Sequence, residues 1–113
     1  MTLEDYFSTG PSFERPVYEA VMAHLVTVGP VHVEPVSVGI FLKRSRSFAQ
    51  LRPMTQWVAV SFALPRTVSS ARIARKVIDT GRSKHHVVNV RGFEEVDAAL
   101  CDWLTEAYLF SPE

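Results

Sequence analysis

Two adjacent histidines are the first residues of this chain that could do chemistry. His85 and His86 stand in the segment KHHVVNV, whose valines predict a β-strand. Neighbouring residues of a strand point to opposite faces of a sheet, so the two imidazoles cannot bind the same metal ion. We therefore expect His85 on an open face and His86 partly buried and hydrogen-bonded. No metal and no cofactor is predicted.

An aspartate and a cysteine lie at the apolar stripe of the last predicted helix. A carboxylate there needs a partner, and Arg91 is the natural candidate for Asp97. Acidic neighbours raise the pKa of a thiol, so Cys101 is expected to be a poor nucleophile. The chain also lacks a glycine-rich phosphate loop and the GxSxG, HExxH and CxxC motifs. We assign no catalytic residue.

Charge is distributed unevenly along the chain, although the formal net charge is zero. Residues 43–84 contain ten basic residues and one acid, Asp79, which gives this segment a net charge of +9. The remaining residues contain two basic residues and eleven acids, which gives −9. This asymmetry predicts a surface that attracts anions. The alternative is that basic strands and acidic helices pair with each other in the fold.

Length and composition indicate a globular protein with one hydrophobic core. The chain has 113 residues, of which 47% are hydrophobic and 21% are charged. Cys101 is the single cysteine, and no apolar run approaches the roughly 20 residues of a membrane span. We expect a cytoplasmic protein without membrane contact. Residues 1–11 are predicted to be a loose arm, and residues 12–113 to be a single α+β domain.

The stretch Val38–Leu64 predicts the sheet that would position these residues. Two apolar runs, Val38–Leu42 and Trp57–Leu64, flank a short middle segment, Ser47–Leu51. Turn-prone residues separate the three segments. This pattern is typical of a three-stranded antiparallel meander. The preceding segment, Val31–Val36, contains a proline and is predicted to be an edge strand or an extended lead-in.

Residues 66–91 leave two interpretations open. One is a helix capped by Ser69 and ended by Gly81. The other is a strand over Arg72–Ile78 that turns at Asp79-Thr80-Gly81 into the strand Lys84–Val90. The turn residues and the valine-rich partner favour the hairpin.

Apolar residues at helical spacing predict two further elements, helices over Phe13–Val28 and Phe93–Phe110. Amphipathic helices bury their stripes against a sheet or against each other. The predicted fold class is α+β, with an antiparallel sheet of four to five strands. The N- and C-terminal helices pack on one face of the sheet, in the order α-β-β-β-β-β-α, and leave the other face at least partly open.

The alternation of side chains along the strands predicts what the open face presents. If Val58, Val60 and Phe62 lie under the helices, then Trp57 and Ser61 point outward with small residues between them. Small residues flanked by a tryptophan and basic groups form a shelf that can stack a base or seat an anion. The candidate ligand-binding residues are Phe41, Arg44, Arg46, Trp57, Arg72, Lys76 and His85.

Four segments of the chain resemble a known family. They are GIFLKRSRSFAQLRP, WVAVSFALPR, KHHVVNV and EEVDAALCDWLTEAY. Together they resemble an uncharacterised bacterial family catalogued as domain of unknown function 5655. The similarity covers residues 13–108, and its most specific pieces are Phe48-Ala49, the His-Val-Val strand and the closing pattern of Asp97, Trp103 and Ala107-Tyr108. The resemblance implies a single α+β domain and brings no activity.

Three functions remain open from the sequence. The first is a small non-enzymatic module whose basic, Trp-bearing sheet face binds an anionic ligand, with nucleic acid as the leading anion. The alternative is a protein–protein or homodimerisation module that uses apolar surface at Met22, Val26 and Trp57. An enzyme with a site at His85 and Asp97 is the least supported.

Overall fold

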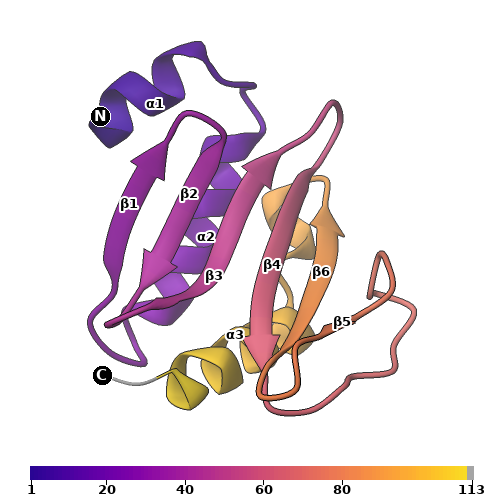
Figure 1. Cartoon of the computed structure of the whole chain (residues 1–113). Helices are drawn as coiled ribbons and strands as arrows, with labels where there is room; N and C mark the ends of the chain where they lie inside the picture. The colour runs from indigo at the N-terminus through magenta and orange to yellow at the C-terminus, as the bar shows by residue number, and fades with distance from the viewer. Residues whose placement is uncertain (112–113) are drawn as a thin grey trace.

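The computed structural model describes residues 1–111, which form an antiparallel sheet with helices packed against it (Figure 1). The elements are α1 (Leu3–Thr9), α2 (Glu14–Leu25), β1 (His32–Val36), β2 (Gly39–Lys43), β3 (Ser47–Pro53), β4 (Val58–Leu64), β5 (Ile78–Asp79), β6 (Lys84–Val90), the 3-10 helix η1 (Phe93–Glu95) and α3 (Ala98–Phe110). The strand order is β1-β2-β3-β4-β6-β5. The predicted α+β class is confirmed, with six strands instead of four to five. Pro112 and Glu113, the end of the expected domain, lie outside the described residues.

The predicted meander forms strands β2, β3 and β4, and the proline-containing segment before it is the edge strand β1. The register pairs Phe41 with Gln50, Gln50 with Ser61, and Ser61 with Val87, so these residues form one row across four strands. The register of β2 and β3 shifts after Leu42, which leaves Phe48 as an extra residue of β3. This bulge explains why Phe48 is buried next to the buried Ala49.

One face of the sheet carries the hydrophobic core. Alternate residues of β4 are buried on this face, namely Val58, Val60, Phe62 and Leu64. Helices α2 and α3 cover it, as Figure 1 shows behind the strands. They bury Val17, Val21 and Leu25 of α2, and Leu100, Leu104 and Ala107 of α3. The other face is not covered by a helix, as the alternation predicted.

The N-terminal segment differs from the loose arm that the sequence suggested. Residues Leu3–Thr9 form α1, and the side chain of Thr2 caps the helix by accepting a hydrogen bond from the Asp5 amide at 3.1 Å. Tyr6 is buried, and its hydroxyl donates a hydrogen bond to the buried Glu14 carboxylate of α2. Leu3 and Phe7 also pack against the core, and the centre of the Phe7 ring lies 5.5 Å from that of the Tyr18 ring of α2, so several side chains tie this segment to the domain.

Residues 66–83 form neither the helix nor the full strand considered above. Only Ile78 and Asp79 pair with β6, and Ile73 adds an isolated bridge to Val88. The turn at Asp79-Thr80-Gly81 is as predicted, with Gly81 at a φ of 89°. The rest of the segment stays irregular because its charged residues provide few apolar side chains to pack on the sheet.

The C-terminal helix α3 begins later than the sequence suggested. Asp97 is its N-cap, since its carboxylate accepts a hydrogen bond from the Leu100 amide at 3.1 Å. Phe93, expected on the apolar stripe, precedes the helix and is 56% exposed. Tyr108, in the last turns of the helix, is buried, and its hydroxyl donates to the Pro30 carbonyl at 2.8 Å.

Candidate anion-binding face

Two hollows adjoin on the uncovered face of the sheet, along β3 and β4. The first has a volume of about 200 Å³ and is lined by Ser47, Phe48, Ala49, Gln50, Ser61, Phe62, Ala63 and His85. The second has a volume of about 250 Å³ and is lined by Gln50, Arg52, Met54, Ala59, Ser61, Arg75 and Val87. They share Gln50 and Ser61 as lining residues, so the two hollows lie next to each other on the sheet. We call the pair of hollows the β3–β4 groove.

Small residues make the floor of the β3–β4 groove. Ala59, Ser61 and Ala63 are the outward residues of β4, because the residues between them point into the core. Gln50 of β3 and His85 of β6 lie beside this floor and supply an amide and an imidazole. The small side chains allow a ligand to approach the sheet backbone closely. The polar side chains offer it hydrogen-bond donors and acceptors along the groove.

Arg52 and Arg75 supply the charge at one end of the groove. Both are exposed, and neither makes an ion pair with any residue that the structure describes. A guanidinium stays charged at all physiological pH values and presents five donors. This end of the groove is therefore electropositive, and no acid of residues 1–111 lines it.

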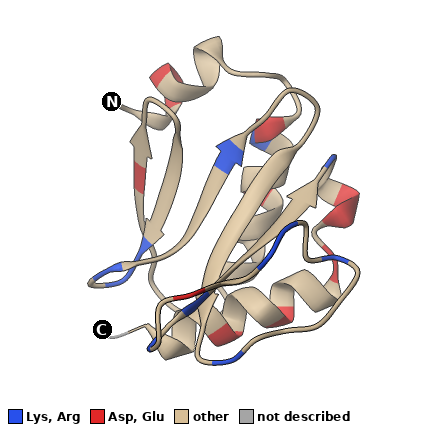
Figure 2. Ribbon diagram, turned by 45° about the vertical axis from the view of Figure 1, so that its right-hand side comes forward, with Lys and Arg blue, Asp and Glu red and all other residues tan. Residues whose placement is uncertain are grey.

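Other members of the basic segment are used within the fold. The ion pairs are Lys43 with Glu34, Arg66 with Glu106 at 2.8 Å, Arg72 with Asp97 at 2.5 Å, and Lys84 with Asp79 at 3.3 Å. Figure 2 shows the blue positions gathered in the turns and in the segment before β6, and most red positions on the helices. Four of the ten basic residues of segment 43–84 therefore form ion pairs with acids among the residues that the structure describes.

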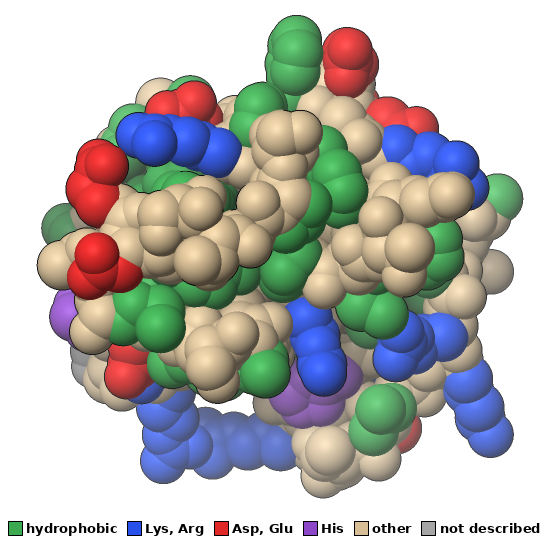
Figure 3. Space-filling view, turned by 90° about the horizontal axis from the view of Figure 1, so that it is seen from above, with side chains coloured by type: hydrophobic (Ala, Val, Ile, Leu, Met, Phe, Trp, Pro, Cys, Tyr) green, Lys and Arg blue, Asp and Glu red, His purple; other side chains and the backbone are tan. Residues whose placement is uncertain are grey.

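Viewed from above, basic side chains project along the lower edge of the molecule, on the side of the uncovered face (Figure 3). Red side chains in this view stand mainly at the left and upper edges. Basic side chains also stand at the upper left and upper right of this view, so the charges are separated on this face only in part.

The structure places two of the predicted binding residues on the uncovered face. His85 lines the groove and is exposed. Phe41 stands in register with Gln50, and the ammonium of Lys43 lies 5.9 Å from the centre of its ring. These two residues follow the alternation of regular strands, which is why the sequence placed them correctly.

Two of the predicted arginines are turned away from that face. Arg44 donates to the carbonyls of Tyr108 at 2.9 Å and Ser111 at 3.1 Å, and its guanidinium lies 4.3 Å from the centre of the Tyr108 ring. Arg72 contacts Asp97 and donates to the Glu95 carbonyl at 3.0 Å. Both lie outside regular strands, so strand alternation does not govern where their side chains point. Arg72, and not the expected Arg91, is the partner of Asp97.

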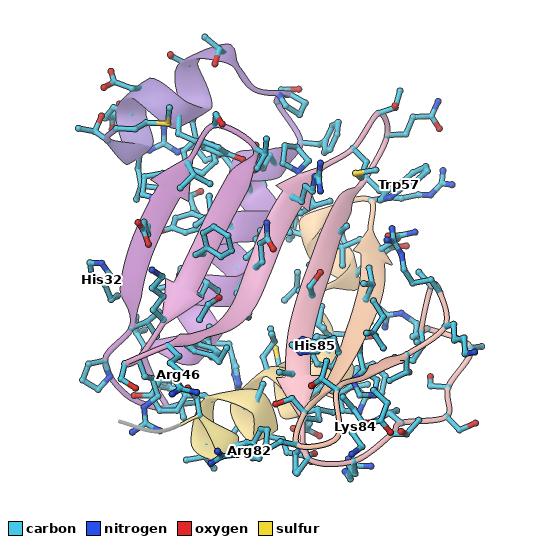
Figure 4. All side chains as sticks on the ribbon, in the orientation of Figure 1. His32, Arg46, Trp57, Arg82, Lys84 and His85 are labelled. Atoms are coloured by element: carbon cyan, nitrogen blue, oxygen red, sulfur yellow. The ribbon has the colours of Figure 1, made fainter. Side chains whose placement is uncertain are left out.

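The other three predicted residues lie near the groove without lining it. Trp57 precedes β4 at the upper end of the sheet (Figure 4), half-buried, with the Arg91 guanidinium 5.9 Å from its ring. Arg46 lies at the other end, in the turn after β2. Lys76 is exposed in the irregular segment.

Sequence reasoning missed Arg52, Arg75 and Gln50. Gln50 and Arg52 alternate with the buried Leu51, so the period of β3 carried a signal for both. Arg75 carried no such signal, because it lies in a segment without regular structure.

His86 is a structural residue of the core, as predicted. Its Nε2 accepts a hydrogen bond from the Val68 amide at 3.0 Å, so its Nδ1 carries the proton and donates to the Lys84 carbonyl at 2.9 Å. The ring stacks on Phe62 with centres 5.4 Å apart. Burial lowers the pKa of His86, which keeps the imidazole neutral.

The remaining titratable candidates also have structural roles. The amide of Leu100 and the guanidinium of Arg72 lower the pKa of Asp97. Burial, with Asp97 and Asp102 nearby, raises the pKa of the Cys101 thiol. Asp97 caps α3 on the covered side of the sheet, whereas His85 lies on the uncovered side, so the two share no cleft.

No group of three or more potential metal ligands is found among residues 1–111. His32, on the edge strand β1, lies across the sheet from His85 on β6 (Figure 4). Within the same residues, no helix has the length and apolar character needed to cross a membrane.

Comparison with known proteins gives a family and no activity. The sequence model of one family, described as a domain of unknown function (DUF5655), matches residues 3–111. A search of curated proteins and a search of solved structures returned no match. Since the match spans nearly the whole chain, this protein belongs to the DUF5655 family of domains of unknown function.

Proposed function

We propose that this chain is a non-enzymatic binding module that holds single-stranded nucleic acid in the β3–β4 groove. One observation carries the proposal. The two hollows of the groove adjoin along β3 and β4, and Arg52 and Arg75 at one end have no acidic partner among the described residues. Two unpaired guanidinium groups beside a polar, small-residue floor suit an anionic chain better than an apolar ligand.

The length and chemistry of the groove favour a strand over a single small anion. From Ser47 to Arg52, β3 extends about 16 Å at about 3.3 Å per residue. Gln50, Ser61 and His85 along this length can hydrogen-bond the edges of unpaired bases, which a duplex keeps paired. We therefore expect single strands to bind more tightly than duplexes of the same length.

Trp57 extends the proposed site at the arginine end. Its carbonyl accepts a hydrogen bond from the amide of Met54, which lines the groove. A base that leaves the groove there meets the exposed part of the indole, and stacking on an aromatic ring contributes about 1–3 kcal/mol per base. The proposal therefore keeps the stacking role that the sequence suggested for Trp57.

A protein–protein or homodimerisation module is the second candidate. Ile78 is 60% exposed and Met54 is 37% exposed, and both stand near the groove. Pairing of sheet edges between copies is disfavoured, because β1 contains Pro35 and β5 has only two residues. Light scattering on dilute protein tests this candidate, and a strict monomer argues against it.

The experiment for the first candidate is a binding titration with a labelled 12-nucleotide single strand and the matching duplex. Fluorescence anisotropy is measured at about 50 and 200 mM salt, a range over which phosphate contacts weaken strongly. Each phosphate contact to a single strand contributes about 0.7 to the slope of log affinity against log salt. The double variant R52Q/R75Q is expected to weaken binding and to lower that slope by about 1.4.

The control is R15Q/R66Q, which removes the same charge from positions outside the groove. Arg15 lies on α2, and Arg66 is paired with Glu106 of α3. This variant should bind nearly as the original chain does. Absence of binding at low salt, or equal losses in the two double variants, would remove the proposal.

A further inference from the structure

A second cavity lies at the end of the sheet away from Trp57. It has a volume of about 110 Å³ and opens between the β2–β3 turn, the β5–β6 turn and the last turn of α3. Each of the two β turns contributes one arginine, Arg46 and Arg82, and Figure 4 shows both beside the end of α3. We call this cavity the α3-end pocket.

The α3-end pocket combines positive charge with an apolar floor. Phe48, Ala63 and Phe110 line it together with Ser47 and Ser83. No aspartate or glutamate of the described chain lines it. Its ligand must therefore satisfy cationic groups and also contact hydrocarbon.

Neither arginine of the pocket is used elsewhere in the described structure. Arg46 and Arg82 are exposed and make no ion pair with any residue between 1 and 111. The neighbouring cations differ: Arg44 contacts Tyr108, and Lys84 contacts Asp79. The fold thus leaves two guanidinium groups available at one small cavity.

We propose that the α3-end pocket binds a small carboxylate with an apolar body, such as an aromatic carboxylic acid. The carboxylate accepts charge-assisted hydrogen bonds from Arg46 and Arg82, since guanidinium geometry matches its two oxygens. The apolar body lies against Phe48 and Phe110. The cavity is smaller than the roughly 300–1,000 Å³ of pockets for drug-sized ligands, so the ligand has one ring or a short branched chain.

The apolar floor separates this ligand class from inorganic phosphate. A phosphate has oxygens on every side, and those facing Phe48 and Phe110 would lose water without gaining a donor. A carboxylate with an apolar body exposes oxygens on one side only. The proposal does not depend on nucleic-acid binding in the groove, although the pocket and the groove share Ser47, Phe48 and Ala63 as lining residues.

The test is a titration of sodium benzoate into the ¹⁵N-labelled full chain at constant ionic strength, followed by amide chemical shifts. The amides of Ser47, Ala63, Ser83 and Phe110 should shift together and saturate. Acetate, which lacks the ring, should bind at least about tenfold more weakly, because it has far less apolar surface to bury in the pocket. Inorganic phosphate should also bind more weakly than benzoate.

Arginine variants test whether benzoate binds in the α3-end pocket. R46Q and R82Q should each weaken benzoate binding by about tenfold, the effect expected of a lost hydrogen bond between charged groups. R52Q removes the same charge from the β3–β4 groove and should change the benzoate affinity by less than about twofold. Both pocket arginines are exposed, so their variants should fold, and the rest of each spectrum shows whether they do.

Three results would overturn the proposal. One is a shift pattern that does not saturate or that spreads over all basic positions. Another is an equal loss of benzoate affinity in R52Q and R46Q. The third is phosphate binding as tight as benzoate binding. No oligonucleotide is present, so each result leaves the proposal for the β3–β4 groove unaffected.

Discussion

His85 and His86 are neighbours in the chain, and they show how differently the two faces of the sheet are used. His86 is fully buried, with both ring nitrogens hydrogen-bonded and its ring stacked on Phe62. His85 is exposed and lines the β3–β4 groove. Ser61 and Phe62 differ in the same way on β4. The covered face stabilises the fold, whereas the uncovered face can present polar groups without a large effect on stability.

The basic residues also fall into two groups, those bound within the fold and those that are exposed. Arg44 holds the end of α3 through the carbonyls of Tyr108 and Ser111, whereas Arg46, two residues later, is exposed at a cavity. A count of charges over the segment cannot separate these roles. What separates them is whether a residue stands where a helix or an acid can reach its side chain.

The largest expected change in stability comes from comparing substitutions at two neighbouring positions on opposite faces of the sheet. Phe62→Ala removes a fully buried ring from the core and should lower the free energy of unfolding by about 3–5 kcal/mol. Ser61→Ala changes the uncovered face and should alter it by less than about 0.5 kcal/mol. Denaturation in urea measures both values. If Ser61→Ala lowered the free energy of unfolding as much as Phe62→Ala does, the uncovered face would also stabilise the fold.

An intermediate effect is expected where α1 meets the core. Tyr6→Phe removes the hydroxyl that donates to the buried Glu14 carboxylate, and should cost about 1.5–3 kcal/mol at neutral pH. Tyr18→Phe, at a half-buried tyrosine of α2, is the matched control and should change stability little. Urea denaturation of the two variants makes the comparison. Equal stabilities would show that the hydrogen bond between Tyr6 and Glu14 contributes little to the fold.

The smallest expected change in stability is confined to mildly acidic pH. Burial lowers the pKa of His86 in the folded state below its unfolded value of about 6.5. The unfolded chain therefore binds more protons in this range, so stability should fall as the pH drops below about 6.5 towards the folded pKa. His86→Gln should remove this part of the pH dependence, and His85→Gln should leave it intact. Thermal unfolding between about pH 5 and 8 measures both profiles. Identical profiles for the two variants would contradict the assignment.

Much of the fold could be predicted because it depends on local periodicity. The alternation in β4 and β6 assigned Phe62 and His86 to the core and Ser61 and His85 to the open face. Such alternation is geometric and holds wherever a strand is regular. For the same reason the alternation of β3 also carried a signal for Arg52, next to the buried Leu51.

The rest depended on tertiary contacts that no local pattern reports. α1 is stabilised by the contact of Tyr6 with Glu14, eight residues away. Arg44 and Arg72 lie in irregular segments, where distant acceptors at Tyr108 and Asp97 decide the direction of the side chain. Arg75 reaches the groove from a segment without period, so its role could be seen only in three dimensions.

The most direct test of the account is the footprint of a single-stranded oligonucleotide on the ¹⁵N-labelled chain at low salt. The account predicts amide shifts at Gln50, Ser61 and Ala63 in the β3–β4 groove, and none of comparable size at Val21 of α2 or Leu104 of α3. Shifts centred on the two helices, with the groove unchanged, would contradict the claim that the uncovered face of the sheet is the binding face.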